Sequence, residues 1–405
     1  LYAMFEHGLV DNPVTQAGAA IDFDGDEAVS RKAAEAGAVL LKNEGGILPL
    51  AASARRIAII GGHADKGVIS GGGSSQVYPG GGPDGGNAVP GIEPTSWPGP
   101  VVFYPSSPLE ELRALMPDTE FVYHDGEDQE AAAALAASSD MALVFGTQWA
   151  SESIDVPLHL DGEQDALVAA VAAANPETVV VLQTGGPVLM PWLGEVKAVL
   201  EAWYPGRMGG AAIANLLTGK VNPSGHLPVT FPASLDQLPY PGEPRSGTAI
   251  YDEGAAVGYK WFDTTGAEPL FAFGHGLSYT DFAYAHPDIT NTGQGLVFSL
   301  DVTNIGDRAG ADVVQVYVEG EGWEAPKRLA GFARVELQPG ETRGISIPID
   351  PRLLAVWDPD NPGWSRAAGS YTFSAGHSSR LFFGSATIEL PALHLPVGWS
   401  PGDAD

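Results

Sequence analysis

The first two thirds of the chain alternate between short apolar runs and longer alanine-rich stretches. The apolar runs have the length of strands and stand at residues 56–60, 120–124, 141–145, 178–183 and 198–204. The stretches between them, at residues 127–138, 162–175 and 208–219, are rich in the helix formers Ala and Leu. Strands that alternate with helices predict a layered α/β domain with a mostly parallel sheet, which we place at residues 28–235.

Near residue 291 the pattern changes to a period of two. In the run LVFSLDV every second residue, from Leu296 to Val302, is apolar, as in a strand with one buried face. Further short runs typical of strands stand at residues 311–318, 345–349, 370–375 and 381–390. The spacing predicts an all-β sandwich over residues 291–395, so the chain is multidomain.

Three other segments show neither pattern. Residues 236–290 are rich in aromatic residues and glycine, and we interpret them as a connector packed across the two domains. Residues 396–405 form a tail. Residues 1–27 begin with apolar side chains at helical spacing, which indicates the last turns of a helix from an upstream domain, followed by a linker.

The charge balance limits the partners of this protein. Asp and Glu number 50 against 20 Lys and Arg, so the formal net charge of −30 repels phosphate backbones and anionic lipids. Nucleic acid and membrane surfaces are therefore not expected partners. The chain has no cysteine, which excludes disulfides and thiolate metal sites, and no run approaches the roughly 18 apolar residues of a membrane helix.

The loop that follows the apolar run at 141–145 carries the best candidate for chemistry. Ligands of open α/β sheets bind at the C-terminal ends of the strands, and Glu152 lies just past one such end. A carboxyl group beside Trp149 and small residues, without an adjacent Arg or Lys, is expected to have a raised pKa and to donate protons. The pair Glu152 and Asp155 is a weak motif, and a solvated loop glutamate is the alternative.

Other motifs fail in detail. The glycine-rich loop after residue 60 lacks both nucleotide-binding spacings, and DFDGDEAVS has Glu27 where a calcium loop needs glycine. No H-E-x-x-H or G-x-S-x-G sequence occurs, so neither a catalytic zinc site nor a serine nucleophile elbow is expected. His275 and Ser278 lie in FGHGLSYT, a segment for which packing between domains is the better interpretation.

Six consecutive blocks of the sequence resemble glycoside hydrolase family 3, the β-glucosidase and β-xylosidase family. The blocks are AAEAGAVLLKNEGGILPL, IAIIGGHAD with SGGGSSQVYP, LDGEQDALVAAVAAANPETVVVLQTGGPVLMPW, AWYPGRMGG, GKVNPSGHLPVTFP and FAFGHGLSYTDFAY. The likeness runs in the family's order from residue 1 to about residue 385. It implies an exo-acting, retaining enzyme built from a (β/α)8-like barrel, an α/β sandwich domain and a fibronectin type III-like sandwich, of which this chain supplies the last two.

The resemblance also assigns roles to residues. The family's general acid/base is a glutamate in a Ser-Glu-Gly-x-Asp-Arg context, and the matching stretch SESID places it at Glu152, with Ser153 and Val156 replacing Gly and Arg. Asp155 is then a candidate loop support, and Trp149, Ser74 and Ser75 are candidate substrate contacts. The family's nucleophilic aspartate lies in a Ser-Asp-Trp motif of the barrel, which this chain does not contain.

The substrate and partners implied are a terminal β-D-glucoside or, alternatively, a β-xyloside, together with the upstream barrel of the same enzyme. No cofactor or metal ion is implied, secretion or a periplasmic location is the family's habit, and a homodimer is left open. The loop at residues 71–100, rich in Gly and Pro, is expected at the active-site rim or in a subunit contact. Against the enzyme stands a non-catalytic module, derived from the same fold, that binds carbohydrate or protein.

Overall fold

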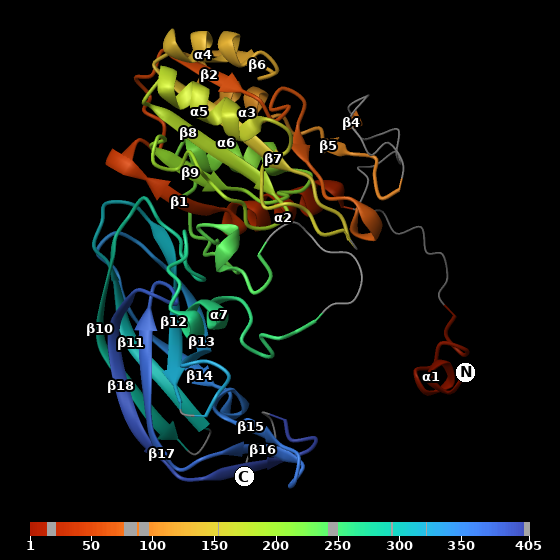
Figure 1. The fold of residues 1–405 in the computed structure, drawn as a ribbon, viewed down its shortest axis with the longest axis vertical. Coiled ribbons are helices and arrows are strands. Elements are labelled where there is room, and N and C mark those ends of the chain that lie inside the picture. Colours follow the sequence, from red (N-terminus) through yellow and green to blue (C-terminus); the bar gives the residue numbers. More distant parts are fainter. Residues whose placement is uncertain are drawn as a thin grey trace.

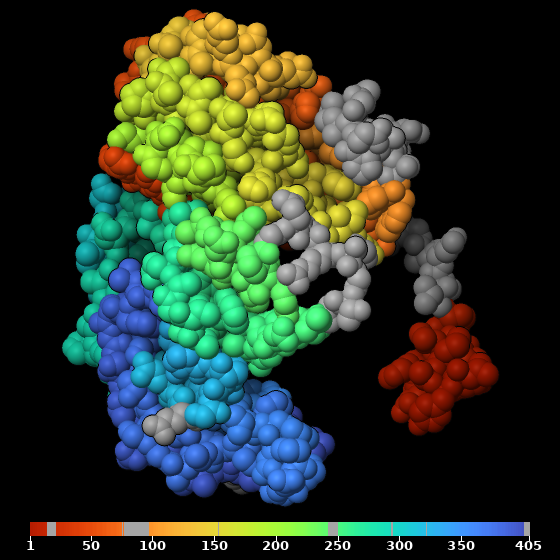
Figure 2. Space-filling view, in the orientation of Figure 1, coloured from red at the N-terminus to blue at the C-terminus, as the bar shows by residue number. Residues whose placement is uncertain are grey.

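The computed structural model describes residues 1–13, 22–76, 87–88, 97–152, 154–241, 250–292, 295–320 and 322–400, apart from the side chains of Ser75, Asn87 and Ala88. An α/β domain packs against an all-β sandwich (Figure 1). In Figure 2 the green segment that follows helix α6 fills the junction between the two bodies. None of the helices among the described residues is long and apolar enough to cross a membrane.

The α/β domain contains a six-stranded sheet in the order β1-β9-β8-β7-β2-β6. Its strands are β1 (Val39–Asn43), β2 (Arg56–Ile60), β6 (Glu120–His124), β7 (Met141–Gln148), β8 (Thr178–Thr184) and β9 (Ala198–Glu201). Only the edge strand β1 pairs antiparallel, with β9, and the other pairs are parallel. The mostly parallel sheet expected from the sequence is confirmed.

Helices cover both faces of this sheet. They are α2 (Phe23–Gly37), α3 (Pro108–Leu115), α4 (Gln129–Ala137), α5 (Gln164–Ala174) and α6 (Gly209–Leu217). Ile57 and Ile59 share a buried cluster with residues of α3 and α6, whereas Ala58 and Ile60 share one with α4 and α5. Because both faces of the central strands β7 and β8 are buried, the runs MALVF and VVVL within them are continuously apolar rather than alternating.

The sandwich is formed by a three-stranded and a four-stranded antiparallel sheet, β10-β11-β14 and β13-β12-β17-β18. Its strands are β10 (Phe282–Thr292), β11 (Gly295–Asn304), β12 (Gly310–Glu319), β13 (Lys327–Leu337), β14 (Thr342–Ile349), β17 (Gly369–Gly376) and β18 (Phe382–Leu390). A small sheet of β15 (Val356–Asp358), β16 (Gly363–Arg366) and β19 (Leu393–Pro396) follows.

Two of the expected boundaries fall inside elements of the structure. Residue 28 lies within α2, and residue 291 lies within β10, so most of β10 belongs to the segment that we assigned to the connector. The pairing register of β10 shifts between Ala285 and Asp288, and His286 has a positive φ of 55°. This irregularity breaks the period-two pattern, which explains why no strand was predicted there. The N-terminal α1 (Tyr2–Glu6) has no buried residue.

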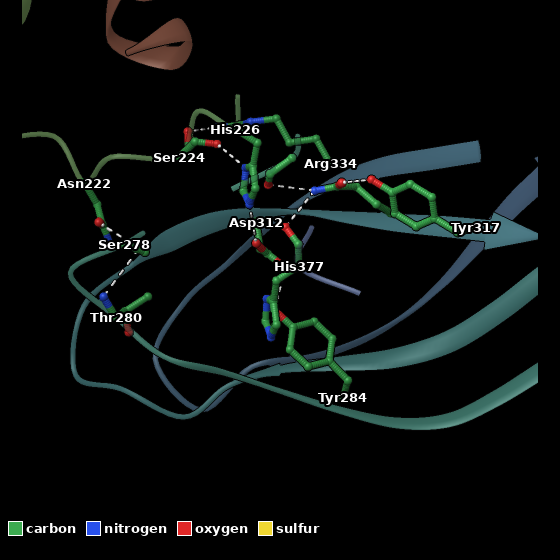
Figure 3. A network of polar contacts seen from close by, with 12 residues as sticks. Asn222, Ser224, His226, Ser278, Thr280, Tyr284, Asp312, Tyr317, Arg334 and His377 are labelled. Carbon is green, nitrogen blue, oxygen red and sulfur yellow. Dashed lines mark hydrogen bonds and ion pairs between the residues drawn. The ribbon is translucent and has the colours of Figure 1, made fainter. Parts of the chain in front are cut away.

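A buried polar network joins the two domains (Figure 3). His226, after α6, places Nε2 at 3.3 Å from Asp312 Oδ1 on β12, an ion-pair distance without hydrogen-bond alignment. Tyr284 donates to the other oxygen of Asp312 at 2.6 Å. Burial by itself raises the pKa of Asp312, but the contacts with His226 hold it below its ordinary value. The carboxylate therefore contacts a side chain from each domain, His226 at ion-pair distance and Tyr284 by a hydrogen bond.

The segment FGHGLSYT packs between the domains, as expected. His275 Nε2 lies 2.9 Å from Leu41 O of the α/β domain, and Ser278 donates its hydroxyl proton to Asn222 Oδ1 at 2.9 Å. On the other side, the side chain of Gln315 on β12 donates to Gly274 O at 3.0 Å. These contacts give both residues structural roles.

Candidate active site

The candidate loop begins where β7 ends, at the C-terminal edge of the parallel sheet. Ser151 forms an isolated parallel bridge with Gly72, and Gly72 N–H donates to Ala150 O at 2.9 Å. Glu152 is exposed, and its Oε2 accepts a hydrogen bond of 2.7 Å from the backbone N–H of Ser74. The carboxylate is therefore held by a backbone donor that lies 78 residues away in the sequence.

The glycines before Ser74 are required by this close approach. A Cβ atom on Gly72 would lie 2.3 Å from Trp149 Cζ2, and one on Gly73 would lie 2.9 Å from Glu152 Cγ. Gly73 also has a φ of +82°, which L side chains rarely adopt. The glycine run therefore lets the loop and the turn that carries Ser74 lie against each other.

Trp149 is half-buried and packs against a small cluster of Ile69, Val101 and Phe103. Its indole nitrogen is buried and has no hydrogen-bond partner among the described residues. The backbone N–H of Trp149 donates to Asp161 Oδ2 at 2.8 Å. These contacts fix the start of the loop, and a stacking role toward substrate stays a prediction.

The half-buried Asp161 and the fully buried Glu201 are two carboxyl groups near the loop. Burial raises the pKa of Asp161 to about 6, although hydrogen bonds from Trp149 N–H and Thr147 offset part of this effect. Glu201, at the end of β9, is fully buried, and burial raises its pKa to about 8. Glu201 Oε1 accepts from Trp203 N–H at 2.7 Å. At neutral pH the Glu201 side chain therefore keeps its proton.

Tyr204 connects this region to the loop. Its hydroxyl group donates to Gln148 O at 2.6 Å and accepts from Ala150 N–H at 2.7 Å. Burial raises the pKa of Tyr204, so the hydroxyl stays protonated. The ring packs against the same cluster as Trp149.

The remaining candidates from the sequence are placed as follows. Asp155 is exposed and makes no hydrogen bond or ion pair with any residue that the structure describes. Ser74 is exposed and contributes its backbone N–H to Glu152, and the side chain of Ser75 lies outside the described part of the chain. Across the described residues, no group of three or more His, Asp or Glu side chains is arranged to hold a metal ion.

Comparison with known families decides the identity of this architecture. The model of the glycosyl hydrolase family 3 C-terminal domain matches residues 38–279, which is more than half of the 405-residue chain. The chain belongs to glycosyl hydrolase family 3. A fibronectin type III-like domain matches residues 312–379. The resemblance and the fold class expected from the sequence are both confirmed.

The similar proteins are β-glucosidases. One from Rhizobium radiobacter is 44% identical over 278 residues, covering 64% of this family 3 chain and 34% of that protein. Thermostable beta-glucosidase B from Acetivibrio thermocellus is 36% identical over 377 residues, covering 89% and 48%. The structure of DesR, a β-glucosidase from Streptomyces venezuelae in complex with D-glucose, matches with a TM-score of 0.84 at 30% identity, covering 96% of this chain and 63% of that one. This chain spans about a third to a half of its curated relatives.

Sequence reasoning did not single out Asp161, Glu201 or Tyr204 as parts of the site. Tyr204 lies in the block AWYPGRMGG, which carries the family resemblance but no catalytic motif. Its hydrogen bond to Ala150 spans 54 residues of sequence, so no local spacing indicates it. Glu201 offers one signal, since it is a single carboxyl group inside the apolar run AVLEAWY.

Proposed function

We propose that the complete enzyme containing this chain hydrolyses terminal β-D-glucosyl residues, with Glu152 as the general acid/base. The observation that carries the proposal is the position of Glu152. Its exposed carboxylate lies at the C-terminal edge of the sheet, where α/β proteins bind ligands, and Ser74 N–H holds one oxygen at 2.7 Å. The hydrogen bond restricts the rotamers of the side chain, which supports a role that needs a fixed direction of proton transfer.

Retaining hydrolysis assigns Glu152 two successive tasks. A nucleophilic carboxylate, which we place in a segment outside this chain, attacks the anomeric carbon while Glu152 gives its proton to the departing glycosidic oxygen. A water molecule then loses a proton to the Glu152 carboxylate, and its oxygen displaces the enzyme ester from the anomeric carbon. In retaining enzymes the two carboxyl groups stand about 5 Å apart. This distance sets where the upstream domain must meet the loop at residues 149–152.

Glucose is the proposed sugar because the similar proteins are named β-glucosidases and one was solved with D-glucose. A β-xyloside is the alternative substrate. Glu152 acts on the glycosidic oxygen, which a β-glucoside and a β-xyloside share, so it does not select between the two sugars. The selection then depends on contacts to the sugar from outside this chain.

The test compares the full-length enzyme with its Glu152→Gln variant on 4-nitrophenyl β-glucoside, β-xyloside and β-N-acetylglucosaminide. We expect fastest release from the glucoside and a loss of about 10²- to 10⁴-fold in the variant, the usual contribution of general acid–base catalysis. Glu163→Gln is the matched control, since Glu163 is an exposed glutamate after the same loop. Hydrolysis of none of the panel would favour the binding module, and full activity in Glu152→Gln would remove Glu152 from the mechanism.

A further inference from the structure

The hydroxyl group of Tyr204 contacts the backbone of the Glu152 loop at two points. It donates to Gln148 O at 2.6 Å and accepts from Ala150 N–H at 2.7 Å, so one oxygen atom bridges both ends of residues 148–150. Gln148 is the last residue of β7, and Ala150 stands two positions before Glu152. The bridge therefore sets the direction in which the chain leaves the sheet.

We propose that Tyr204 is a positioning residue for Glu152. By fixing the backbone of residues 148–150, it holds the Glu152 carboxyl group where it can transfer a proton to the glycosidic oxygen. The inference rests on the proposed function, because it assigns Tyr204 a role that acts only through Glu152. The hydroxyl itself transfers no proton to the substrate. It supplies one donor and one acceptor to the loop backbone, and both are satisfied.

The tyrosine ring is fixed by close packing. It lies against Ile69, Val101 and Phe103, and a Cβ on Gly71 would come within 2.8 Å of its Cε2 atom. A Cβ on Gly185 would lie 2.9 Å from the Tyr204 hydroxyl oxygen and 2.7 Å from Ala150 Cβ. Neither position leaves room for a side chain. The hydroxyl therefore has a defined location relative to the sheet.

The backbone that carries Tyr204 is anchored in turn. Trp203 has a positive φ of 56°, and its N–H donates to the buried carboxyl group of Glu201 at 2.7 Å. The loop itself is tied on its other side by Gly72 N–H, which donates to Ala150 O. Ala150 thus has both backbone groups engaged, one by the turn at residues 72–74 and one by Tyr204. Removing the hydroxyl leaves the Ala150 N–H and the Gln148 carbonyl without this partner, and among the described residues Ala150 then keeps only the hydrogen bond from Gly72 N–H.

A displaced acid has a kinetic signature that a general loss of structure does not have. Glycosides with good leaving groups depart without protonation, whereas poor leaving groups depend on the acid. Misplacing Glu152 therefore steepens the dependence of log kcat/KM on the pKa of the leaving group. A mere loss of folded enzyme lowers kcat/KM by the same factor for every substrate.

The experiment measures this slope for the full-length enzyme with a series of aryl β-glucosides, from 2,4-dinitrophenyl to phenyl. We expect Tyr204→Phe to lose about ten- to a hundredfold on the poorest leaving group and less than about twofold on the best. Tyr279→Phe is the matched control, because it removes a buried hydroxyl that donates to Leu216 O at 3.0 Å, away from the loop. Its slope should equal that of the wild type.

A second variant keeps the inference testable if Tyr204→Phe does not fold. Gly185→Ala adds one methyl group that pushes on Ala150 and on the Tyr204 hydroxyl while removing no hydrogen-bonding group. It should steepen the slope in the same direction. A wild-type slope, or a uniform loss across the series, in the folded variants overturns the positioning role.

The Glu152→Gln variant, measured on the same series, separates the two proposals. A steep slope in Glu152→Gln with a wild-type slope in both Tyr204→Phe and Gly185→Ala means that the proposed function stands and the positioning role is wrong. A wild-type slope in Glu152→Gln means that the proposed function is wrong, and the role of Tyr204 falls with it.

Discussion

Replacing Glu201 with glutamine is expected to stabilise the full-length enzyme, and to do so increasingly as the pH rises. The Glu201 side chain is fully buried, and Thr184 Oγ1 lies 3.0 Å from its Oε2 and 2.7 Å from Gly186 O. Since a threonine hydroxyl has one proton, both contacts are satisfied when Thr184 donates to Gly186 and a protonated Glu201 donates to Thr184. A glutamine can donate in the same position and still accept from Trp203 N–H.

The magnitude follows from the raised pKa. Burial moves the pKa of Glu201 from 4.5 to about 8, so between these values the folded state holds a proton that the unfolded state releases. The contribution of Glu201 to the free energy of unfolding is fully present below about pH 4.5. It falls as the pH rises, because the folded state then binds more protons than the unfolded state. At about 1.4 kcal/mol per pH unit, the wild type loses about 3 kcal/mol between pH 4.5 and pH 7. The Glu201→Gln variant does not.

The assay is urea unfolding of the wild type and Glu201→Gln, followed by tryptophan fluorescence, from about pH 5 to pH 8. The two unfolding free energies should nearly agree at the acidic end and diverge toward neutral pH, with the variant more stable. Glu130→Gln, at an exposed position on α4, is the control and should run parallel to the wild type. A constant difference at every pH, or a variant that is less stable at pH 7, would mean that Glu201 does not keep a proton in the folded state.

Three other predictions concern Asp161, Gly73 and the chain on its own. Asp161→Asn should remove a second loss of stability between about pH 4 and pH 6, since burial raises the pKa of Asp161 from 3.8 to about 6; the check is the same unfolding series. Gly73→Ala should lower kcat/KM on phenyl β-glucoside more than Gly162→Ala does, because both glycines have positive φ but only a Cβ on Gly73 meets Glu152; equal losses would contradict this. The purified chain of residues 1–405 alone should hydrolyse no aryl glucoside, because we propose that the nucleophile lies outside it; turnover by a preparation free of the full enzyme would overturn that proposal.

The stability of the domain junction gives a further prediction with the opposite sign. The carboxylate of Asp312 has a lowered pKa despite its burial, so its contribution is present above its ordinary pKa of 3.8 and is lost as the pH falls through that region. Asp312→Asn should therefore destabilise the protein at neutral pH and change it little in acid. Limited proteolysis between the domains, compared with the wild type at both pH values, measures this. Equal protection at neutral pH would show that the network contributes nothing to the junction.

Much of the fold follows from local patterns. The runs RIAII and MALVF are central strands whose apolar side chains alternate between two buried helical layers, and EFVYH is an edge strand that buries Phe121 on one of them. The position of Glu152 could also be predicted from the sequence, because the prediction requires only that an apolar strand ends and that a carboxyl group follows it. These features depend on residues that are neighbours in the chain.

The support of the site depends on residues far apart in sequence. The Ser74 N–H and the Tyr204 hydroxyl reach the loop at residues 148–152 across separations of 78 and 54 to 56 residues, and neither contact leaves a local pattern. The substrate contact predicted for Ser74 stays a prediction, and the structure adds a hydrogen bond from its backbone N–H to Glu152 that the sequence did not indicate. Backbone donors are set by the path of the chain, so the residue type at position 74 carries no information about them.

The most direct test of the central claim is product analysis with the full-length Glu152→Ala variant, 2,4-dinitrophenyl β-glucoside and sodium azide. If Glu152 is the acid/base, the activated substrate still forms the glycosyl-enzyme, water attacks it slowly without a base, and azide, which needs no base, accelerates turnover. We expect β-glucosyl azide as the product and a rate that rises with azide concentration. Wild-type release of glucose that azide leaves unchanged would contradict it.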